Sequence, residues 1–140
     1  MSTHTPAAIT MTNFKLVVGD LAAAERFYTA MGMKPVSRNT GGDAEVRQTQ
    51  CWMSETGGGN AFTLILTQFL ALPPPRKPVY PGEIWLVFTV PDVDAMVALV
   101  AREGGSILRP GENIPDHNVR AAVVADPEGH PIELVGPLRG

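Results

Sequence analysis

One carboxylate, Glu133, stands inside a short apolar segment near the C-terminus, at residues 132–135 (Ile-Glu-Leu-Val). The segment follows residues 126–129 (Asp-Pro-Glu-Gly), where the proline fixes φ and the glycine supplies a positive φ, so a turn leading into a strand is expected. An ionised carboxylate among apolar side chains is costly unless it is paired, hydrogen-bonded or bound to a metal. We therefore expect Glu133 either to act as a general acid or base, or to pair with Arg120 or Lys15.

Further candidates for chemistry lie at the starts of two other predicted strands. Asn13 and Lys15 should share one strand face, because side chains alternate along a strand. Lys15 could then pair with Glu133 or bind an anionic ligand, or it could lie at a solvent-exposed edge. Trp85 offers a large flat apolar surface on which an aromatic ligand could stack, although it could equally fill the core.

His117 and Arg120 stand at the entry to a predicted strand, after a loop predicted over residues 110–115, which is rich in glycine and proline. A histidine at the mouth of a cavity could act as an acid, a base or a hydrogen-bond donor, whereas a lone loop histidine is often only solvated. Arg120 is a candidate ligand contact. His130 lies in the predicted turn, and no role is expected for it.

A polar strand is predicted over residues 46–53, and Arg47 and Trp52 are its candidate ligand contacts. Because side chains alternate, one of two sets should line a cavity. These sets are Arg47, Thr49 and Cys51, or Gln48, Gln50 and Trp52, and the sequence does not decide between them. Cys51 is expected to be a small buried residue without thiolate character.

The composition argues against several classes of function. The net charge is −3 and the basic residues are scattered, so a nucleic-acid partner is not expected. A single cysteine excludes an internal disulfide. No apolar run approaches the ~20 residues of a membrane span, and the first residues lack a signal-peptide pattern, so a cytoplasmic protein without a membrane partner is expected.

The elements that must position these residues follow one plan twice. Each half reads strand, helix and three strands, at 13–18, 21–31, 35–38, 46–53 and 62–67, and then at 84–90, 93–103, 107–108, 119–125 and 131–135. Asp92 follows Asp20, and Gly104 follows Gly32, by the same 72 positions (92 − 20 and 104 − 32). An internal duplication explains this offset.

The predicted fold is therefore α+β, with two βαβββ modules whose curved mixed sheets lie side by side as a cupped surface and carry the helices on the outer face. We expect a flexible tail over 1–11 and a single domain over 12–140. Within this domain, module one spans 12–67, a proline-rich linker spans 68–83 and module two spans 84–137.

The paired motifs resemble those of the vicinal oxygen chelate superfamily, which includes glyoxalase I, bleomycin resistance proteins and extradiol dioxygenases. The resemblance rests on Val18-Gly19-Asp20-Leu21 running into Arg26-Phe27-Tyr28, on Pro91-Asp92-Val93-Asp94, and on Asp126-Pro127-Glu128-Gly129 ahead of Ile132-Glu133-Leu134. It implies a small-molecule cavity inside the curved sheets and commonly a homodimer.

In metal-using members of this superfamily, four strand positions supply the ligands, and the motifs place them at Asn13, Ile65, Trp85 and Glu133. The usual ligands are His, Gln and Glu, so only Glu133 matches the pattern. Ile65 and Trp85 have no ligand atom, and we expect no metal and no other cofactor.

The resemblance and the lost ligands imply a metal-independent protein that binds an apolar or aromatic small molecule. Asn13, Ile65 and Trp85 would line its cavity. One alternative is a metal-independent isomerase, lyase or cyclase, in which Glu133 transfers a proton and Lys15, Asn13 or His117 stabilises negative charge. A second alternative is a metal-dependent lyase of the glyoxalase type.

Overall fold

The computed structural model describes residues 13–41, 47–58, 61–70 and 84–140. Its first module contains β1 (Asn13–Val17), α1 (Leu21–Met31), β2 (Lys34–Gly41), β3 (Gln48–Ser54) and β4 (Thr63–Phe69). Its second contains β5 (Leu86–Thr89), α2 (Val93–Arg102), β6 (Ser106–Ile114), a 3₁₀ turn (Pro115–His117), β7 (Val119–Ala125) and β8 (Pro131–Gly136). The predicted tail and most of the predicted linker lie outside the described residues, and β4 includes Gln68 and Phe69, which the prediction assigned to that linker.

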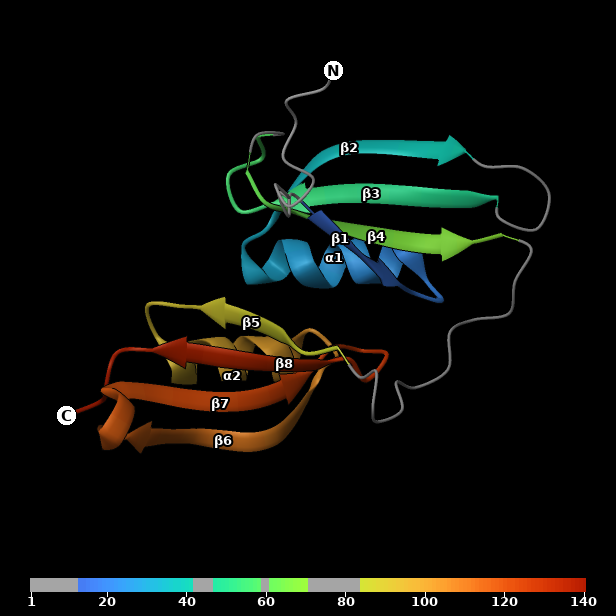
Figure 1. Cartoon of the computed structure of the whole chain (residues 1–140). Coiled ribbons are helices and arrows are strands. Elements are labelled where there is room, and N and C mark those ends of the chain that lie inside the picture. The colour runs from blue at the N-terminus through green and yellow to red at the C-terminus, as the bar shows by residue number, and fades with distance from the viewer. Residues whose placement is uncertain (1–12, 42–46, 59–60, 71–83) are drawn as a thin grey trace, which may run out of the picture.

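Each module forms a four-stranded mixed sheet, and the two sheets have the same topology (Figure 1). The strand order is β1-β4-β3-β2 in the first sheet and β5-β8-β7-β6 in the second. In both, the first and last strands of the module pair in parallel and the other neighbours are antiparallel. The predicted α+β fold of two βαβββ modules is confirmed, and the matching topology fits the predicted duplication.

The two helices begin in the same way. The Asp20 side chain accepts a hydrogen bond from the backbone N–H of Ala23, and Asp92 accepts one from Ala95, both at 3.0 Å. An aspartate N-cap of this kind satisfies a backbone donor that the first helical turn leaves unpaired. Gly32 ends α1 with a φ of +118°, a left-handed conformation that favours glycine. Among the described residues, no helix is long and apolar enough to cross a membrane.

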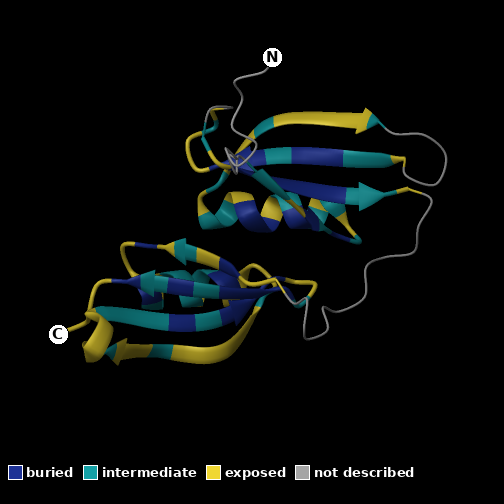
Figure 2. Ribbon diagram, in the orientation of Figure 1, coloured by how far each residue is buried: buried dark blue, intermediate teal, exposed yellow. Residues whose placement is uncertain are grey.

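Each sheet has a helix face, on which α1 or α2 packs, and a far face. The helix faces meet the helices in one buried core, and alternation along the strands assigns alternate side chains to it. In the first sheet, Leu16, Leu66 and Cys51 form one such buried row across β1, β4 and β3. Figure 2 shows this burial concentrated on the central strands, whereas β2 and β6 are largely exposed.

The strand β6 departs from the prediction. It extends from Ser106 to Ile114, through the segment that was predicted to be a glycine-proline loop. Its register against β7 shifts between Ile107 and Arg109 and again between Arg109 and Glu112. β6 lies at the edge of its sheet, where a proline without a backbone N–H is tolerated. The register shifts are bulges that accommodate the irregular segment.

Candidate functional site

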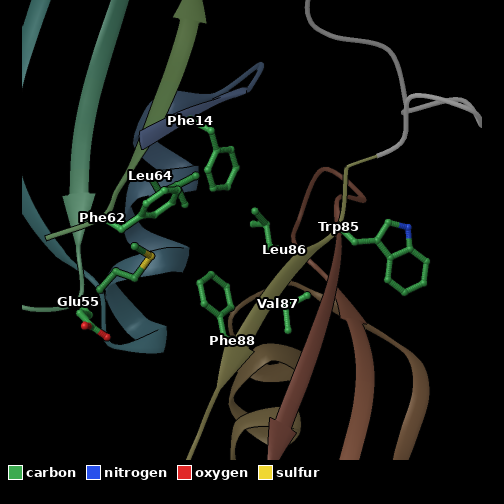
Figure 3. A pocket seen from close by; sticks show the side chains of 9 residues that line it. Phe14, Glu55, Phe62, Leu64, Trp85, Leu86, Val87 and Phe88 are labelled. Atoms are coloured by element: carbon green, nitrogen blue, oxygen red, sulfur yellow. The ribbon is translucent and has the colours of Figure 1, made fainter. Parts of the chain in front are cut away.

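A groove of about 460 Å³ lies between the two modules. Figure 3 shows its side chains. On one side they come from β1, β4 and the segments that precede β4 and follow α1 and β3, and on the other from β5 and the residue before it. Its lining is almost entirely apolar and consists of Phe14, Met33, Glu55, Phe62, Leu64, Trp85, Leu86, Val87 and Phe88. We call this the intermodule groove.

Strand register explains how the aromatic side chains reach the groove. Phe14 on β1 lies opposite Leu64 on β4. Phe62, just before β4, places its ring centroid 5.8 Å from that of Phe14. On the other side, Leu86 and Phe88 alternate along β5 and point across the groove towards these residues (Figure 3). The groove is thus formed mainly by residues of the helix faces.

Trp85 and Val87 form the exposed rim of the groove, with 48% and 59% of their surface accessible. Figure 3 shows the Trp85 indole on the opposite side of β5 from Leu86 and Phe88. Glu55, also exposed, lies at the end of the groove near Phe62 (Figure 3). Trp85 is the predicted ligand contact that belongs to this groove; Asn13 and Ile65 are not among its described lining residues.

Three predicted site residues meet on the far face of the first sheet. Lys15, Ile65 and Trp52 are direct neighbours across β1, β4 and β3. The far-face set of β3 is therefore Gln48, Gln50 and Trp52, and neither of the two predicted sets is among the described lining residues of the intermodule groove. Cys51 on the helix face is fully buried, and this burial raises the pKa of its thiol to about 11.

A chain of polar contacts holds this far face together. The Lys15 ammonium donates to the Gln48 side-chain oxygen at 2.8 Å. The Gln50 amide donates to the same Gln48 oxygen at 2.8 Å and to the Thr67 hydroxyl at 3.3 Å. Lys15 is therefore engaged by an amide, and among the described residues no ion pair joins it to Glu133.

Glu133 lies on the far face of the second sheet, between Val87 on β5 and Val123 on β7. It lines a small cavity of about 150 Å³ whose other charged residues are Arg109 and Glu112. Glu133 and Lys15 thus belong to different sheets. Within the described part of the chain, Glu133 forms no ion pair, so the predicted pairing with Lys15 or Arg120 is not found.

Arg120 points to the opposite side of the second sheet from Glu133. Its guanidinium donates to both oxygens of Asp94 on α2, at 2.9 and 3.0 Å, and to the Gly111 carbonyl oxygen at 2.9 Å. The Arg120 hydrogen bonds hold the pKa of Asp94 below its usual range. Arg120 therefore joins β7 to α2 and the β6 bulge and is placed away from the intermodule groove.

The remaining predicted residues are spread around the modules. His117 is exposed at the end of the 3₁₀ turn, and Arg47 is exposed just before β3. Asn13 is partly buried at the first position of β1. None of these three side chains is among the described lining residues of the intermodule groove.

Sequence reasoning missed a buried polar cluster formed by Tyr28, Asp126 and His130. The Tyr28 hydroxyl donates to Asp126 at 2.8 Å, and His130 Nδ1 lies 2.7 Å from the same Asp126 oxygen. Tyr28 belongs to α1, whereas the other two residues flank the turn before β8. Nearby, the Gly19 amide donates to the Glu128 carboxylate at 2.7 Å. We call Tyr28, Asp126 and His130 the intermodule cluster, because it joins the two modules.

The electrostatics of the intermodule cluster favour a charged pair. The hydrogen bond to Asp126 raises the pKa of His130 and outweighs the opposing effect of burial, and a hydrogen bond with the Val17 backbone adds to the rise. Burial alone would raise the pKa of Asp126, but hydrogen bonds from His130 and Tyr28 lower it. Only the four-residue spacing of Asp126 and His130 was available as a sequence signal, and spacing within a turn does not reveal a partner on a distant helix.

The family of the chain follows from comparison with known proteins. Residues 9–134 match the model of the Glyoxalase/Bleomycin resistance protein/Dioxygenase superfamily. The chain belongs to this superfamily. A comparison with curated protein sequences found no match.

Solved structures of glyoxalase proteins share the fold of this superfamily member. A glyoxalase family protein from Bacillus cereus has a TM-score of 0.80 at 22% identity, covering 99% of both chains. The trypanothione-dependent glyoxalase I of Leishmania major has a TM-score of 0.72 at 26% identity, covering 92% of this chain and 87% of its own. A glyoxalase I mutant from Zea mays has a TM-score of 0.71 at 24% identity, over 89% of this chain and 45% of the maize chain.

The four positions that the motif resemblance assigns to metal ligands hold residues whose side chains do not suit a divalent ion. Ile65 and Trp85 have no side-chain atom that ligates a divalent cation, and Asn13 offers only a neutral amide oxygen. Glu133 is the one carboxylate of the four, and its cross-strand neighbours are Val87 and Val123. Among the described residues, no group of three or more His, Cys, Asp or Glu side chains is placed to hold a metal.

Proposed function

We propose that this superfamily member binds an apolar or aromatic small molecule in the intermodule groove, without a metal. The observation that carries the proposal is the groove itself, where Phe14, Phe62, Leu64, Leu86 and Phe88 line one space of about 460 Å³. This volume lies in the range of about 300–1,000 Å³ that is typical of small-molecule sites.

The energetics of such a site favour planar apolar ligands. Each Å² of apolar surface removed from water contributes about 25 cal/mol, so a ring enclosed by this lining gains several kcal/mol. Aromatic side chains add offset or edge contacts of about 0.5–1.5 kcal/mol for each ring pair. Phe14 and Phe62, tilted by 40° to each other, present ring surface to a third ring.

Metal independence is supported by the donor chemistry of the four superfamily positions. A divalent ion in proteins takes several oxygen or imidazole ligands, whereas Asn13 and Glu133 together supply one neutral oxygen donor and one carboxylate. The metal-dependent lyase is therefore the least supported alternative.

Binding is tested by titrating the purified chain with 2-naphthylmethanol, a neutral aromatic ligand, and measuring the dissociation constant calorimetrically. Phe62→Ala should weaken binding about fivefold, because it removes one aromatic contact. Phe62 is 48% exposed, so this variant should fold normally. Leu108→Ala, at an equally exposed site that does not line the groove, is the matched control. Absence of saturable binding, or equal affinity of the two variants, would contradict the proposal.

One observation favours a second candidate function. Glu133 borders a small cavity and, among the described residues, no ion pair neutralises it. We propose proton transfer by Glu133, in a metal-independent isomerase or lyase, as the alternative to simple binding. If this alternative holds, Glu133→Gln would abolish isomerase or lyase activity and leave binding in the intermodule groove unchanged, because Glu133 is not among the described lining residues of that groove.

We also propose a homodimer and a cytoplasmic location. The homodimer is supported by Trp85 and Val87, which are 48% and 59% exposed and which a second copy of the chain could cover. The cytoplasmic location is supported by the single cysteine, Cys51, which is buried and unpaired. Sedimentation of the purified chain tests the first of these proposals, since a monomer at micromolar concentration would contradict it.

A further inference from the structure

The intermodule groove contains one charged side chain among its described lining residues, Glu55. Its carboxylate lies at one end of the groove, on the side of the first module, as Figure 3 shows. In the described part of the chain, Glu55 forms no hydrogen bond and no ion pair. Lys34 lies on the neighbouring strand opposite Ser54, yet no salt bridge joins it to Glu55. Glu55 therefore gives its end of the groove a negative charge that the described part of the chain does not neutralise.

The aromatic lining is also compatible with a positively charged ligand. The face of an aromatic ring carries negative electrostatic potential, so a cation within about 6 Å of the ring centre is attracted. Phe14 and Phe62 offer two such rings next to each other, and Phe88 offers a third across the groove. No Lys or Arg occurs among the described lining residues. The Glu55 carboxylate attracts a cationic group, and no cationic side chain among the described lining residues opposes it.

We infer that the ligand of the intermodule groove is an aromatic organic cation, such as a protonated aryl amine. Its ring lies among Phe14, Phe62 and Phe88, and its ammonium group lies at the Glu55 end. This inference rests on the proposed function, because it names the ligand class of the same groove. It makes Glu55 the residue that selects the ligand by charge.

Three ligands with the same ring and different charge test the inference. They are 2-naphthylmethylamine as the cation, 2-naphthylmethanol as the neutral ligand and 2-naphthoate as the anion, and each dissociation constant is measured at pH 7 and low salt. The cation should bind about fivefold more tightly than the neutral ligand, which matches the upper range for an exposed ion pair. The anion should bind about fivefold more weakly. Salt at about 0.5 M should reduce both differences, because it screens exposed charges.

Variants at Glu55 separate this inference from the proposed function. Glu55→Gln should bring the three dissociation constants within about twofold of one another, and Glu55→Lys should reverse their order. Glu103→Gln, an exposed carboxylate at the end of α2 that does not line the groove, should keep the wild-type order.

The failures of the two proposals are distinguishable. If the wild-type chain binds all three ligands equally well, or if Glu55→Lys keeps the cation preference, the charge selection is wrong while the apolar site stands. If none of the three ligands binds, both the inference and the proposed function are wrong.

Discussion

The far faces of the two sheets differ sharply although the modules share one topology. In the first sheet the centre of this face is buried: Gln50, Ile65 and Thr67 are 7%, 2% and 0% exposed. In the second it carries Val87, which is 59% exposed, and Val123 beside a lone carboxylate. The helix faces, in contrast, are apolar and buried in both modules. Packing on the helix constrains one face of each sheet, and the other face is free to acquire a separate role.

The largest expected effect comes from placing a carboxylate on each far face. Ile65→Glu should cost about 3–5 kcal/mol of stability, or prevent folding, because a charge would enter a buried position. Val87→Glu, at a position that is exposed in the single chain and opposite Glu133 on β8, should cost the monomer about 1 kcal/mol or less, mainly from like-charge repulsion. Urea denaturation of both variants measures the difference. Equal losses of stability in the two variants would show that position 87 is as buried in solution as position 65.

The second expected effect is a pH dependence of stability that comes from the contact between the modules. His130 has a raised pKa in the folded chain, so its contribution is complete below about pH 6.5 and is lost as the pH rises through the folded value. Asp126 has a lowered pKa, so its contribution is complete above about pH 3.9 and is lost as the pH falls through the folded value. Stability from this pair should therefore be greatest between about pH 4 and 6.5.

Thermal unfolding across the pH range measures this profile. His130→Asn should flatten its alkaline side, whereas His117→Asn, at an exposed position, should leave it unchanged. An unchanged profile in His130→Asn would exclude the pair as its origin.

The third expected effect isolates the hydrogen bond that α1 makes with the second module. Tyr28→Phe removes the donor to Asp126 and should cost about 1–2 kcal/mol, because a buried carboxylate oxygen loses one of its partners. The ring itself keeps its edge contact with Phe27. Denaturant titration at pH 5 and pH 9 should show losses that differ, because Tyr28 and His130 contact the same Asp126 oxygen. A loss independent of pH would mean that Tyr28 and His130 act separately.

The smallest expected effect is that of Glu133→Gln on stability, at about 0.5 kcal/mol or less, because Glu133 has no ion pair to lose within the described residues. The Glu133→Gln variant can also be assayed for ligand binding and for isomerase or lyase activity. A stabilisation above about 1 kcal/mol would instead show that the Glu133 charge is costly on the second far face.

Local signals in the sequence identified most of the fold. Asp20 and Asp92 marked the helix starts, Gly32 marked the end of α1, and apolar alternation located β1, β7 and β8. These features depend on a few neighbouring residues, so the sequence contains them directly. The extent of β6 was missed because Pro110 and Gly111 signal a loop, whereas an edge strand accepts both.

The site was harder to predict because its parts are distant in the chain. Trp85, which lines the candidate groove, was among the predicted ligand contacts, but Phe14, Phe62, Leu86 and Phe88 look like ordinary core residues until the two modules are placed beside each other. His130 was dismissed as a turn residue, although its partner Asp126 also accepts a hydrogen bond from Tyr28, on a helix of the other module. Alternation predicts which strand face a residue occupies, but it does not show which other element meets that face.

The parallel pairing of the first and last strands in each module has a consequence for folding. Asn13 pairs opposite Thr63, and Leu86 opposite Ile132, so neither sheet is complete until the last strand of its module is made. Such non-local pairing slows folding, because the intervening chain must close into a loop first. On the ribosome, the strands of the first sheet are available early, whereas the Tyr28 hydroxyl waits for a carboxylate 98 residues further along the chain. We expect the first sheet to form before the intermodule cluster joins the two modules.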